Sequence, residues 1–178
     1  MKHKLIVCFL AIILFACKEA GNKPLVQNSE KEHTPTTYYF IRHAEKDRSN
    51  PLDNNPHLTE SGLIRAQDWA KLFQDVDFDA VYTTNFIRTK ETALPTALQN
   101  KLELSFYNPK SMDIKAFLKA TKGQAILIVG HSESTPNFVN AVLNENKYQA
   151  IDDSVFNTYF IVTVNDDGTI TDSKLVMP

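Results

Sequence analysis

The chain has 178 residues, of which 43% are hydrophobic and 22% are charged. This is an ordinary composition for a globular protein, and it excludes a collagen-like or low-complexity chain. The formal net charge of −2 gives no electrostatic reason to bind nucleic acid, so no such partner is expected. Both cysteines, Cys8 and Cys17, lie near the N-terminus, which excludes a disulfide scaffold, a zinc–thiolate site and a cysteine nucleophile from the rest of the chain.

The N-terminal residues are typical of an export signal. Two lysines precede an unbroken run of 11 apolar residues, Leu5–Phe15, which is shorter than the roughly 20 residues that span a bilayer. The run leads into Leu14-Phe15-Ala16-Cys17, which resembles the lipobox of bacterial lipoproteins. The resemblance implies that residues 1–16 are a signal peptide and that Cys17 becomes the lipidated first residue of the mature chain. The alternative is an ordinary signal peptide with a chance cysteine, which would leave a free thiol in an exported protein.

Residues 17–36 are predicted to be the lipidated cysteine and a flexible tether. They are rich in Lys, Glu, Asn and Thr, include two prolines and show almost no apolar periodicity. A tether of this kind would hold a domain at residues 37–178 off a membrane surface. We therefore expect an exported lipoprotein, anchored to a membrane through Cys17 on the periplasmic side or at the cell surface.

The remaining residues alternate between strand and helix patterns. In chain order they predict a strand at Thr37–Ile41, a polar loop at Arg42–Pro56, a helix N-capped by Thr59, a strand at Phe78–Tyr82 and a helix at Phe86–Leu98, broken or kinked near Pro95. They continue with a strand at Leu102–Phe106, a helix at Met112–Thr121, a central parallel strand at Gln124–Val129, a helix at Pro136–Leu143 and a strand pair at Val155–Val164 and Ile170–Val176. The buried face of the first helix is predicted at Leu63, Ala66, Ala70 and Phe73. This alternation predicts an α/β domain with a mostly parallel central sheet and helices on both faces.

Side chains that can carry chemistry follow three of the predicted strands. Arg42-His43 comes directly after the first strand, Arg88 lies shortly after the second, and Gly130-His131 comes directly after the central one. Each of them alone is commonly a solvated surface residue. In an open α/β sheet, however, ligands bind beyond the carboxyl ends of the strands, so together these positions predict one site there.

The motifs around these residues resemble those of a known family. Four blocks occur in order: Tyr39–Lys46, Leu58–Gly62 with Ala66, Thr84-x3-Arg88-x3-Thr92, and Val129–Ser132. In this combination they are similar to the signature of the histidine phosphatase superfamily, also called phosphoglycerate mutase-like. The resemblance implies a central sheet with flanking helices, a phosphohistidine intermediate and a catalytic site built from Arg42, His43, Arg88 and His131.

These residue types suit phosphoryl transfer, which mainly needs positioning and cancellation of negative charge. A neutral imidazole is nucleophilic near pH 7, so His43 is expected to attack phosphorus and carry the phosphoryl group of a small phosphorylated substrate. The guanidiniums of Arg42 and Arg88 are expected to bind the phosphate oxygens through their planar forks, with His131 as a further donor. This chemistry requires no metal ion and no cofactor, and neither is expected.

The proton donor is not given by a matching motif. The acid phosphatase branch of the resembled family has an aspartate directly after its second histidine, where this chain has Ser132. The nearest carboxylates in sequence are Glu133, two residues after His131, and Glu45, two residues after His43. We take Glu133 as the candidate donor and interpret Glu45 as the structural partner of an arginine.

The sequence therefore favours a membrane-tethered phosphatase outside the cytoplasm that acts on phosphomonoesters or phosphohistidine. One alternative is a mutase of phosphorylated metabolites, which is disfavoured by export and by the short segment Ala93–Gln124, where a substrate lid would be built. Another is a non-catalytic lipoprotein that binds an anion or a partner in the same pocket. The intact set of four pocket residues disfavours it.

Overall fold

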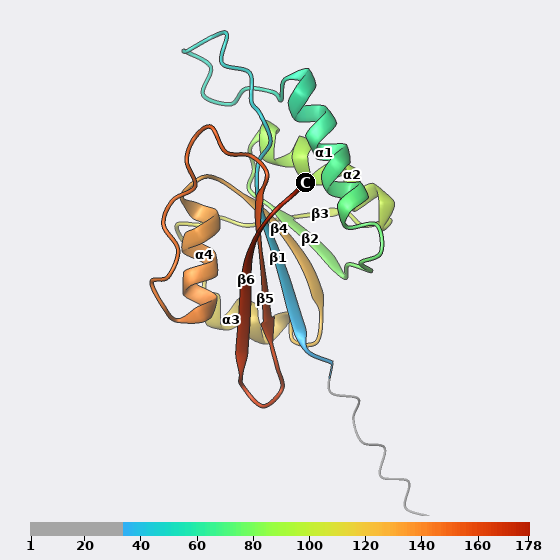
Figure 1. Ribbon diagram of the computed structural model, residues 1–178, viewed down its shortest axis with the longest axis vertical. Helices are drawn as coiled ribbons and strands as arrows, with labels where there is room; N and C mark the ends of the chain where they lie inside the picture. Colours follow the sequence, from blue (N-terminus) through green and yellow to red (C-terminus); the bar gives the residue numbers. More distant parts are fainter. Residues whose placement is uncertain (1–33) are drawn as a thin grey trace, which may run out of the picture. The chain divides into compact units, whose positions relative to one another are not determined.

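The computed structural model describes residues 34–178, which form one six-stranded sheet with four helices (Figure 1). The strands are β1 (Thr36–Arg42), β2 (Ala80–Thr83), β3 (Leu104–Phe106), β4 (Ala125–Gly130), β5 (Thr158–Val164) and β6 (Ile170–Val176). The helices are α1 (Glu60–Leu72), α2 (Ile87–Gln99), α3 (Ile114–Ala120) and α4 (Ser134–Leu143). The predicted α/β fold class is confirmed, and every predicted element is present in the predicted order.

The predicted signal peptide, Cys17 and most of the predicted tether lie outside the described residues. β1 begins one residue earlier than predicted, because Thr36 pairs with Val164 and is 4% exposed. Within residues 34–178, no helix is long and apolar enough to cross a membrane.

The sheet topology brings the ends of three strands together. The strand order is β3-β2-β4-β1-β5-β6, in which the first four strands are parallel, β5 is antiparallel to β1, and β6 is antiparallel to β5. The predicted central parallel strand, β4, pairs with both β1 and β2. Residues that follow β1, β2 and β4 therefore meet at one edge of the sheet.

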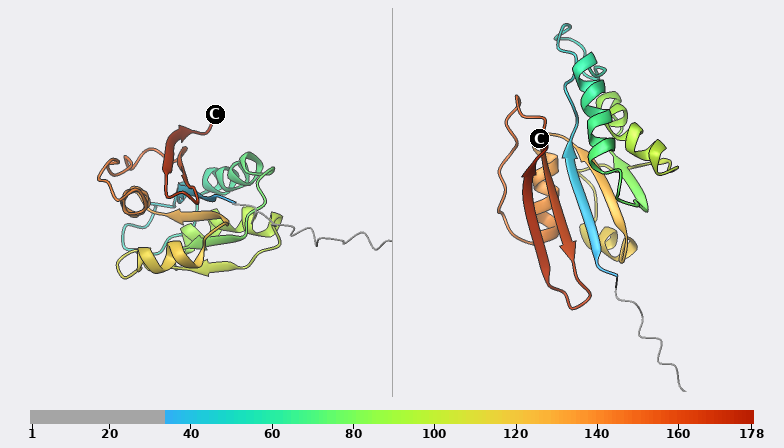
Figure 2. Two further views of the ribbon diagram at one scale, coloured as in Figure 1. Left: turned by 90° about the horizontal axis from the view of Figure 1, so that it is seen from below. Right: turned by 45° about the vertical axis from the view of Figure 1, so that its right-hand side comes forward.

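Helices cover both faces of the sheet, with α1 and α2 on one face and α3 and α4 on the other (Figure 2). Side chains alternate along a strand, so β4 contributes Ile126 and Ile128 to one core and Leu127 and Val129 to the other. All four are at most 1% exposed. Burial on both faces accounts for the uninterrupted apolar run that this strand shows in the sequence.

The buried face of α1 differs from the prediction at one position. Leu63 is 49% exposed. The helix instead turns a neighbouring set of side chains inward, made of Gly62, Ala66, Trp69 and Ala70. Trp69 is fully buried against the sheet, and the size of its ring determines which stripe of the helix faces the core.

The predicted break in α2 is absent, since the helix runs from Ile87 to Gln99 with Pro95 inside it. A proline removes one N–H from the helical hydrogen bonds. Ala93 and Ala97, on either side of Pro95, are both fully buried against the sheet. Tertiary packing of this face therefore outweighs the local cost of the proline.

The start of α1 rests directly on the loop that follows β1. Thr59 caps the helix as predicted: its hydroxyl accepts a hydrogen bond from the backbone N–H of Gly62 (3.1 Å) and donates one to the carbonyl oxygen of Glu45 (3.2 Å). A Cβ atom on Gly62 would lie 2.3 Å from that same carbonyl oxygen. Only glycine allows this close approach, so Gly62 determines how the loop carrying His43 packs on the helix.

Replacing Gly62 with alanine should lower the free energy of unfolding by about 1–3 kcal/mol, the usual cost of overpacking. The sign of this change is informative, because replacing a helical glycine with an alanine that fits normally raises the free energy of unfolding by about 0.4–1 kcal/mol. Urea denaturation measures the effect, with Gln67→Ala on the exposed face of α1 as the control. A Gly62→Ala variant as stable as the wild-type protein would contradict the close contact with Glu45.

Candidate active site

The four residues predicted to form the site come from the adjoining ends of β1, β2 and β4. His43 directly follows β1 and donates its backbone N–H to the carbonyl oxygen of Gly130 (2.9 Å), the last residue of β4. His131 follows at once, and the centroids of the two imidazole rings are 5.5 Å apart. Arg88 lies in the first turn of α2, directly after β2, and its charge acts on both histidines.

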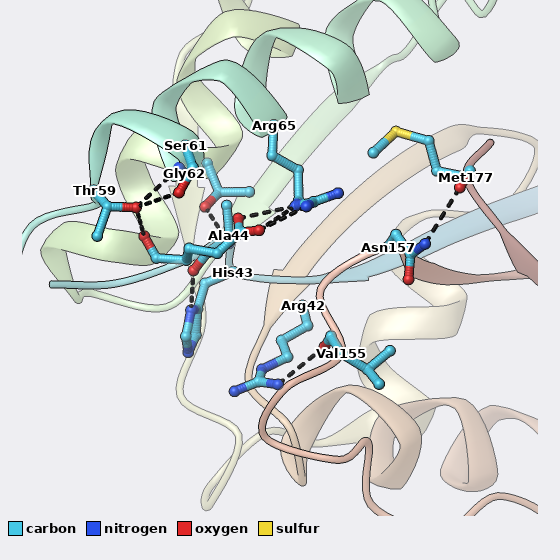
Figure 3. Close-up of polar contacts among 12 residues, drawn as sticks. Arg42, His43, Ala44, Thr59, Ser61, Gly62, Arg65, Val155, Asn157 and Met177 are labelled. Atoms are coloured by element: carbon cyan, nitrogen blue, oxygen red, sulfur yellow. Dashed lines mark hydrogen bonds and ion pairs between the residues drawn. The ribbon is translucent and has the colours of Figure 1, made fainter. Parts of the chain in front are cut away.

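The hydrogen bond of His43 determines which ring nitrogen can react. Nδ1 lies 2.7 Å from the carbonyl oxygen of Ala44, as Figure 3 shows. A carbonyl oxygen can only accept a hydrogen bond, so Nδ1 carries the proton and donates it. In the neutral ring, Nε2 then keeps its lone pair, and it is the nucleophilic atom.

Burial keeps the His43 ring neutral. His43 is 4% exposed, and desolvation together with the charges of Arg42 and Arg88 lowers its pKa from 6.5 to about 3, although the bond to Ala44 acts in the opposite direction. The lone pair on Nε2 is therefore available throughout the physiological pH range.

Burial favours the neutral form of His131 as well. Its Nε2 lies 2.9 Å from the hydroxyl oxygen of Thr84, and its backbone N–H donates to the hydroxyl of Ser134 (3.0 Å). Burial, and after it the charges of Arg88 and Arg42, lowers its pKa from 6.5 to about 4. A bound phosphate dianion would reverse the effect of the two charges and favour a protonated ring.

Arg42 is almost completely buried, at 1% exposure, and a distant loop holds its guanidinium. Nη1 donates to the carbonyl oxygens of Asp152 (2.8 Å) and Val155 (3.0 Å; Figure 3), and Nη2 donates to the carboxylate of Asp153 (2.5 Å). The ring of Phe156 lies 4.5 Å from the guanidinium carbon. The fork expected to bind phosphate is thus engaged with residues 152–156, and Nε is the nitrogen that remains without a partner in the described part of the chain.

Arg88 has fewer partners than Arg42. Its guanidinium carbon lies 4.5 Å from the centroid of the Phe86 ring, and its buried Nε and Nη1 atoms have no hydrogen-bond partner among residues 34–178. Burial, and after it the charge of Arg42, lowers the pKa of Arg88. Buried N–H groups without partners are costly. The three such nitrogens, one on Arg42 and two on Arg88, can donate to the oxygens of an anion.

The two candidate proton donors lie in different surroundings. The Glu45 carboxylate accepts hydrogen bonds from Nε (2.8 Å) and Nη2 (2.6 Å) of Arg65, a geometry that matches its interpretation as a structural partner. Glu133 immediately precedes α4, is exposed and lines a cavity next to His131. Within the described residues, no group of three or more His, Cys, Asp or Glu side chains is placed to hold a metal ion.

Sequence reasoning missed the residues that position this site. Thr92 accepts the backbone N–H of Ala44 (3.0 Å) and donates to the carbonyl oxygen of Arg88 (2.7 Å), so it ties the His43 loop to α2. Thr84, just after β2, forms a hydrogen bond between its hydroxyl and the ring Nε2 of His131. The spacing Thr84-x3-Arg88-x3-Thr92 contained this signal. No sequence signal identified residues 152–156, because they contact Arg42 across more than 100 residues of sequence.

Comparisons with known proteins relate part of the sequence to one family. The sequence model of the histidine phosphatase superfamily (branch 1) matches residues 38–108, which include Arg42, His43 and Arg88. Among curated protein sequences, none matches the chain. The resemblance inferred from the motifs is therefore confirmed over these residues.

Solved structures show the same fold. A phosphoserine phosphatase variant from Entamoeba histolytica with bound phosphoserine is 15% identical with a TM-score of 0.60, and the alignment covers 78% of this chain and 95% of that one. A mycobacterial glucosyl-3-phosphoglycerate phosphatase with VO3 is 11% identical with a TM-score of 0.62, covering 79% and 97%. A phosphoglycerate mutase from Plasmodium falciparum is 15% identical with a TM-score of 0.55, covering 80% and 91%. The chain thus has the fold of phosphoglycerate mutase-like histidine phosphatases.

The two neutral histidines predict how stability depends on pH. His43 and His131 have pKa values of about 3 and about 4 in the folded protein, against an ordinary value of 6.5. The unfolded chain therefore binds more protons below pH 6.5, and stability that is complete above this pH is lost as the pH falls toward 4. The loss for His43 alone should be about 2 kcal/mol at pH 5 relative to pH 8.

Urea denaturation between pH 8 and pH 5 measures this slope. A His43→Gln/His131→Gln double variant should lose most of it. Equal slopes in the wild-type protein and the double variant would show that the two rings are not held neutral by burial.

Proposed function

We propose that this chain is a metal-independent phosphatase that hydrolyses phosphomonoesters or phosphohistidine through a phosphohistidine on His43. One observation carries the proposal: a neutral imidazole, with its lone pair on Nε2, lies among three buried arginine N–H groups that have no partner within residues 34–178. Phosphoryl transfer through a covalent intermediate requires at least a nucleophile and, next to it, hydrogen-bond donors for the phosphoryl oxygens.

The first step transfers the phosphoryl group to the protein. Nε2 of His43 forms a bond to phosphorus while the bond from phosphorus to the ester oxygen breaks, and the leaving oxygen takes a proton from Glu133 or from water. Nε of Arg42 and both free nitrogens of Arg88 donate to the phosphoryl oxygens, whose charge they offset. The bond from Nδ1 to Ala44 holds the ring in the reactive tautomer throughout.

The second step releases phosphate. A water oxygen attacks phosphorus, the bond to Nε2 breaks, and the electron pair returns to the imidazole. The proton of the attacking water passes to the group that protonated the leaving oxygen, so the protein returns to its starting state. Two steps with a covalent intermediate replace one difficult displacement by water.

Turnover of phosphate esters tests this proposal. Purified residues 18–178 should hydrolyse esters from a broad panel in the presence of a chelator, with product measured as inorganic phosphate. His43→Ala should reduce kcat/KM by at least about 10³-fold, as loss of a nucleophile does. Arg88→Lys should cost on the order of 10²-fold, because an ammonium does not reproduce the guanidinium donors.

His57→Ala is the matched control, since this histidine is exposed and pairs with Glu91 away from the site. Activity that disappears with chelator and returns with a divalent ion would contradict the mechanism. So would full activity in His43→Ala. A protein that binds phosphate but turns over no ester would instead support a non-catalytic anion-binding protein.

We further propose that the protein is exported and held on a membrane by lipid attached to Cys17. The basic start, the apolar run Leu5–Phe15 and the lipobox-like Leu14–Cys17 support this proposal. Because one acyl chain binds a membrane only weakly, several chains on one residue are needed for firm anchoring. The enzyme would then meet its substrate outside the cytoplasm.

Cell fractionation and intact mass of the purified protein test the anchor. The mature chain should begin at Cys17, carry the added mass of acyl chains and remain with the membrane. A Cys17→Ser variant should either keep its signal or appear as soluble exported protein, with phosphatase activity retained. A wild-type mature chain that starts at another residue, or that lacks the added lipid mass, would contradict the lipid anchor at Cys17. The catalytic proposal would not be affected.

A further inference from the structure

A cavity of about 750 Å³ adjoins the candidate active site on the side of His131 and Arg88, which both line it. Its volume lies within the range of pockets that bind small molecules. The cavity is formed by the connection between β3 and α3 and by the first turns of α4. Its apolar walls are Phe86, Tyr107, Pro109, Met112, Ile114 and Phe138.

The polar groups of this cavity are distributed unevenly. Arg88, His131 and Thr84 lie together at the end next to His43. The other two charged side chains that line it, Lys110 and Glu133, are both exposed to solvent. A phosphate held by Arg88 would therefore place the rest of an ester in the apolar part of the cavity.

Two hydroxyl groups in the wall, those of Tyr107 and Ser134, already have partners. Ser134 accepts the backbone N–H of His131 (3.0 Å) and also bonds the hydroxyl of Tyr107, which is buried. Phe138 packs against Tyr107, with 5.7 Å between the ring centroids. This part of the wall offers aromatic and aliphatic surface to the leaving group.

The proton donor points to the same type of leaving group. Glu133 is the one carboxylate among the described residues that line the cavity, and it is exposed. Glu45 is held by Arg65. An alcohol leaves as an alkoxide, a base about as strong as hydroxide, so it needs full protonation. A phenol has a pKa of about 10, so a phenolate can leave with little help from an acid.

We infer that the substrates of this site are aryl phosphate monoesters, with the aromatic ring in the cavity lined by Phe86, Tyr107, Met112 and Phe138 and the phosphate at Arg88 and His43. The inference rests on the proposed phosphatase function, because it assigns the phosphate to the same site. The inference adds the class of leaving group. The apolar wall of the cavity and the exposed position of Glu133 both favour an aryl group.

Binding to the inactive His43→Ala variant tests the cavity separately from catalysis. The probes are 2-naphthyl phosphate, phenyl phosphate and phosphoserine, titrated by calorimetry. The second ring of the naphthyl group buries additional apolar surface, so 2-naphthyl phosphate should bind about 10-fold tighter than phenyl phosphate. Phosphoserine should bind more weakly than either. Equal binding of naphthyl and phenyl phosphate, or tighter binding of phosphoserine, would overturn the inference.

Two further substitutions, each made in the His43→Ala variant so that the esters are not hydrolysed, locate the binding surface. Met112→Glu places a charge in the apolar wall, and it should reduce the ratio of naphthyl to phenyl affinity to near one. Leu98→Glu makes the same kind of change at a position that is 66% exposed on α2 and does not line this cavity, and it should leave the ratio unaltered. A ratio that responds equally to both variants would contradict the assignment.

Turnover by the wild-type protein distinguishes failure of the inference from failure of the proposed function. Acetyl phosphate has a good leaving group but no apolar body, so it reports phosphoryl transfer alone. The inference predicts that kcat/KM for 2-naphthyl phosphate exceeds that for phenyl phosphate by about 10-fold. Turnover of acetyl phosphate without this preference would overturn the inference and keep the phosphatase. No turnover of any probe would overturn both.

Discussion

The burial of two guanidiniums beside two uncharged imidazoles is the constraint on which the site depends. Arg42 is 1% exposed, and taking a cation out of water is costly unless hydrogen bonds and counter-charge compensate. Two backbone carbonyls and Asp153 compensate Arg42. Arg88 has the ring of Phe86 and two buried N–H groups still without a partner within residues 34–178. The remaining cost is what an incoming phosphate would relieve. Burial, and after it the same positive charges, lowers the pKa of His43 and favours its neutral ring.

The sheet makes this arrangement possible because β1 and β4 lie side by side. The pairing continues one residue past β1, through the backbone bond of His43 to Gly130. Gly130 has to be glycine, since a Cβ atom there would lie 2.7 Å from the hydroxyl of Thr135 and 2.8 Å from that of Tyr107. Thr92 and Gly62 then hold the loop after His43 against α2 and α1. The ring of His43 is thus positioned by backbone contacts and short side chains.

The strand and helix order, and the position of the site, could be predicted from the sequence because they depend on local pattern. Arg42 ends an apolar strand and Arg88 lies at the start of a helix. His43 and His131 directly follow strands, so the meeting of the four residues follows from topology. The hydrogen bonds that hold the guanidinium of Arg42 could not be predicted, because Asp153 lies 111 residues away in a loop without a sequence pattern of its own. The exposure of Leu63 was missed, and the break that was one of two alternatives at Pro95 is absent, for a related reason: packing against the sheet, not local propensity, decides both.

The structure of the protein with bound vanadate tests the central claim most directly. Vanadate adopts the geometry of a phosphoryl group in transfer. The account predicts vanadium in line with Nε2 of His43, with equatorial oxygens within hydrogen-bond distance of Nε of Arg42 and of Nε and Nη1 of Arg88. Vanadate bound at Lys110 or elsewhere on the surface, with these three nitrogens still unpaired, would contradict the account.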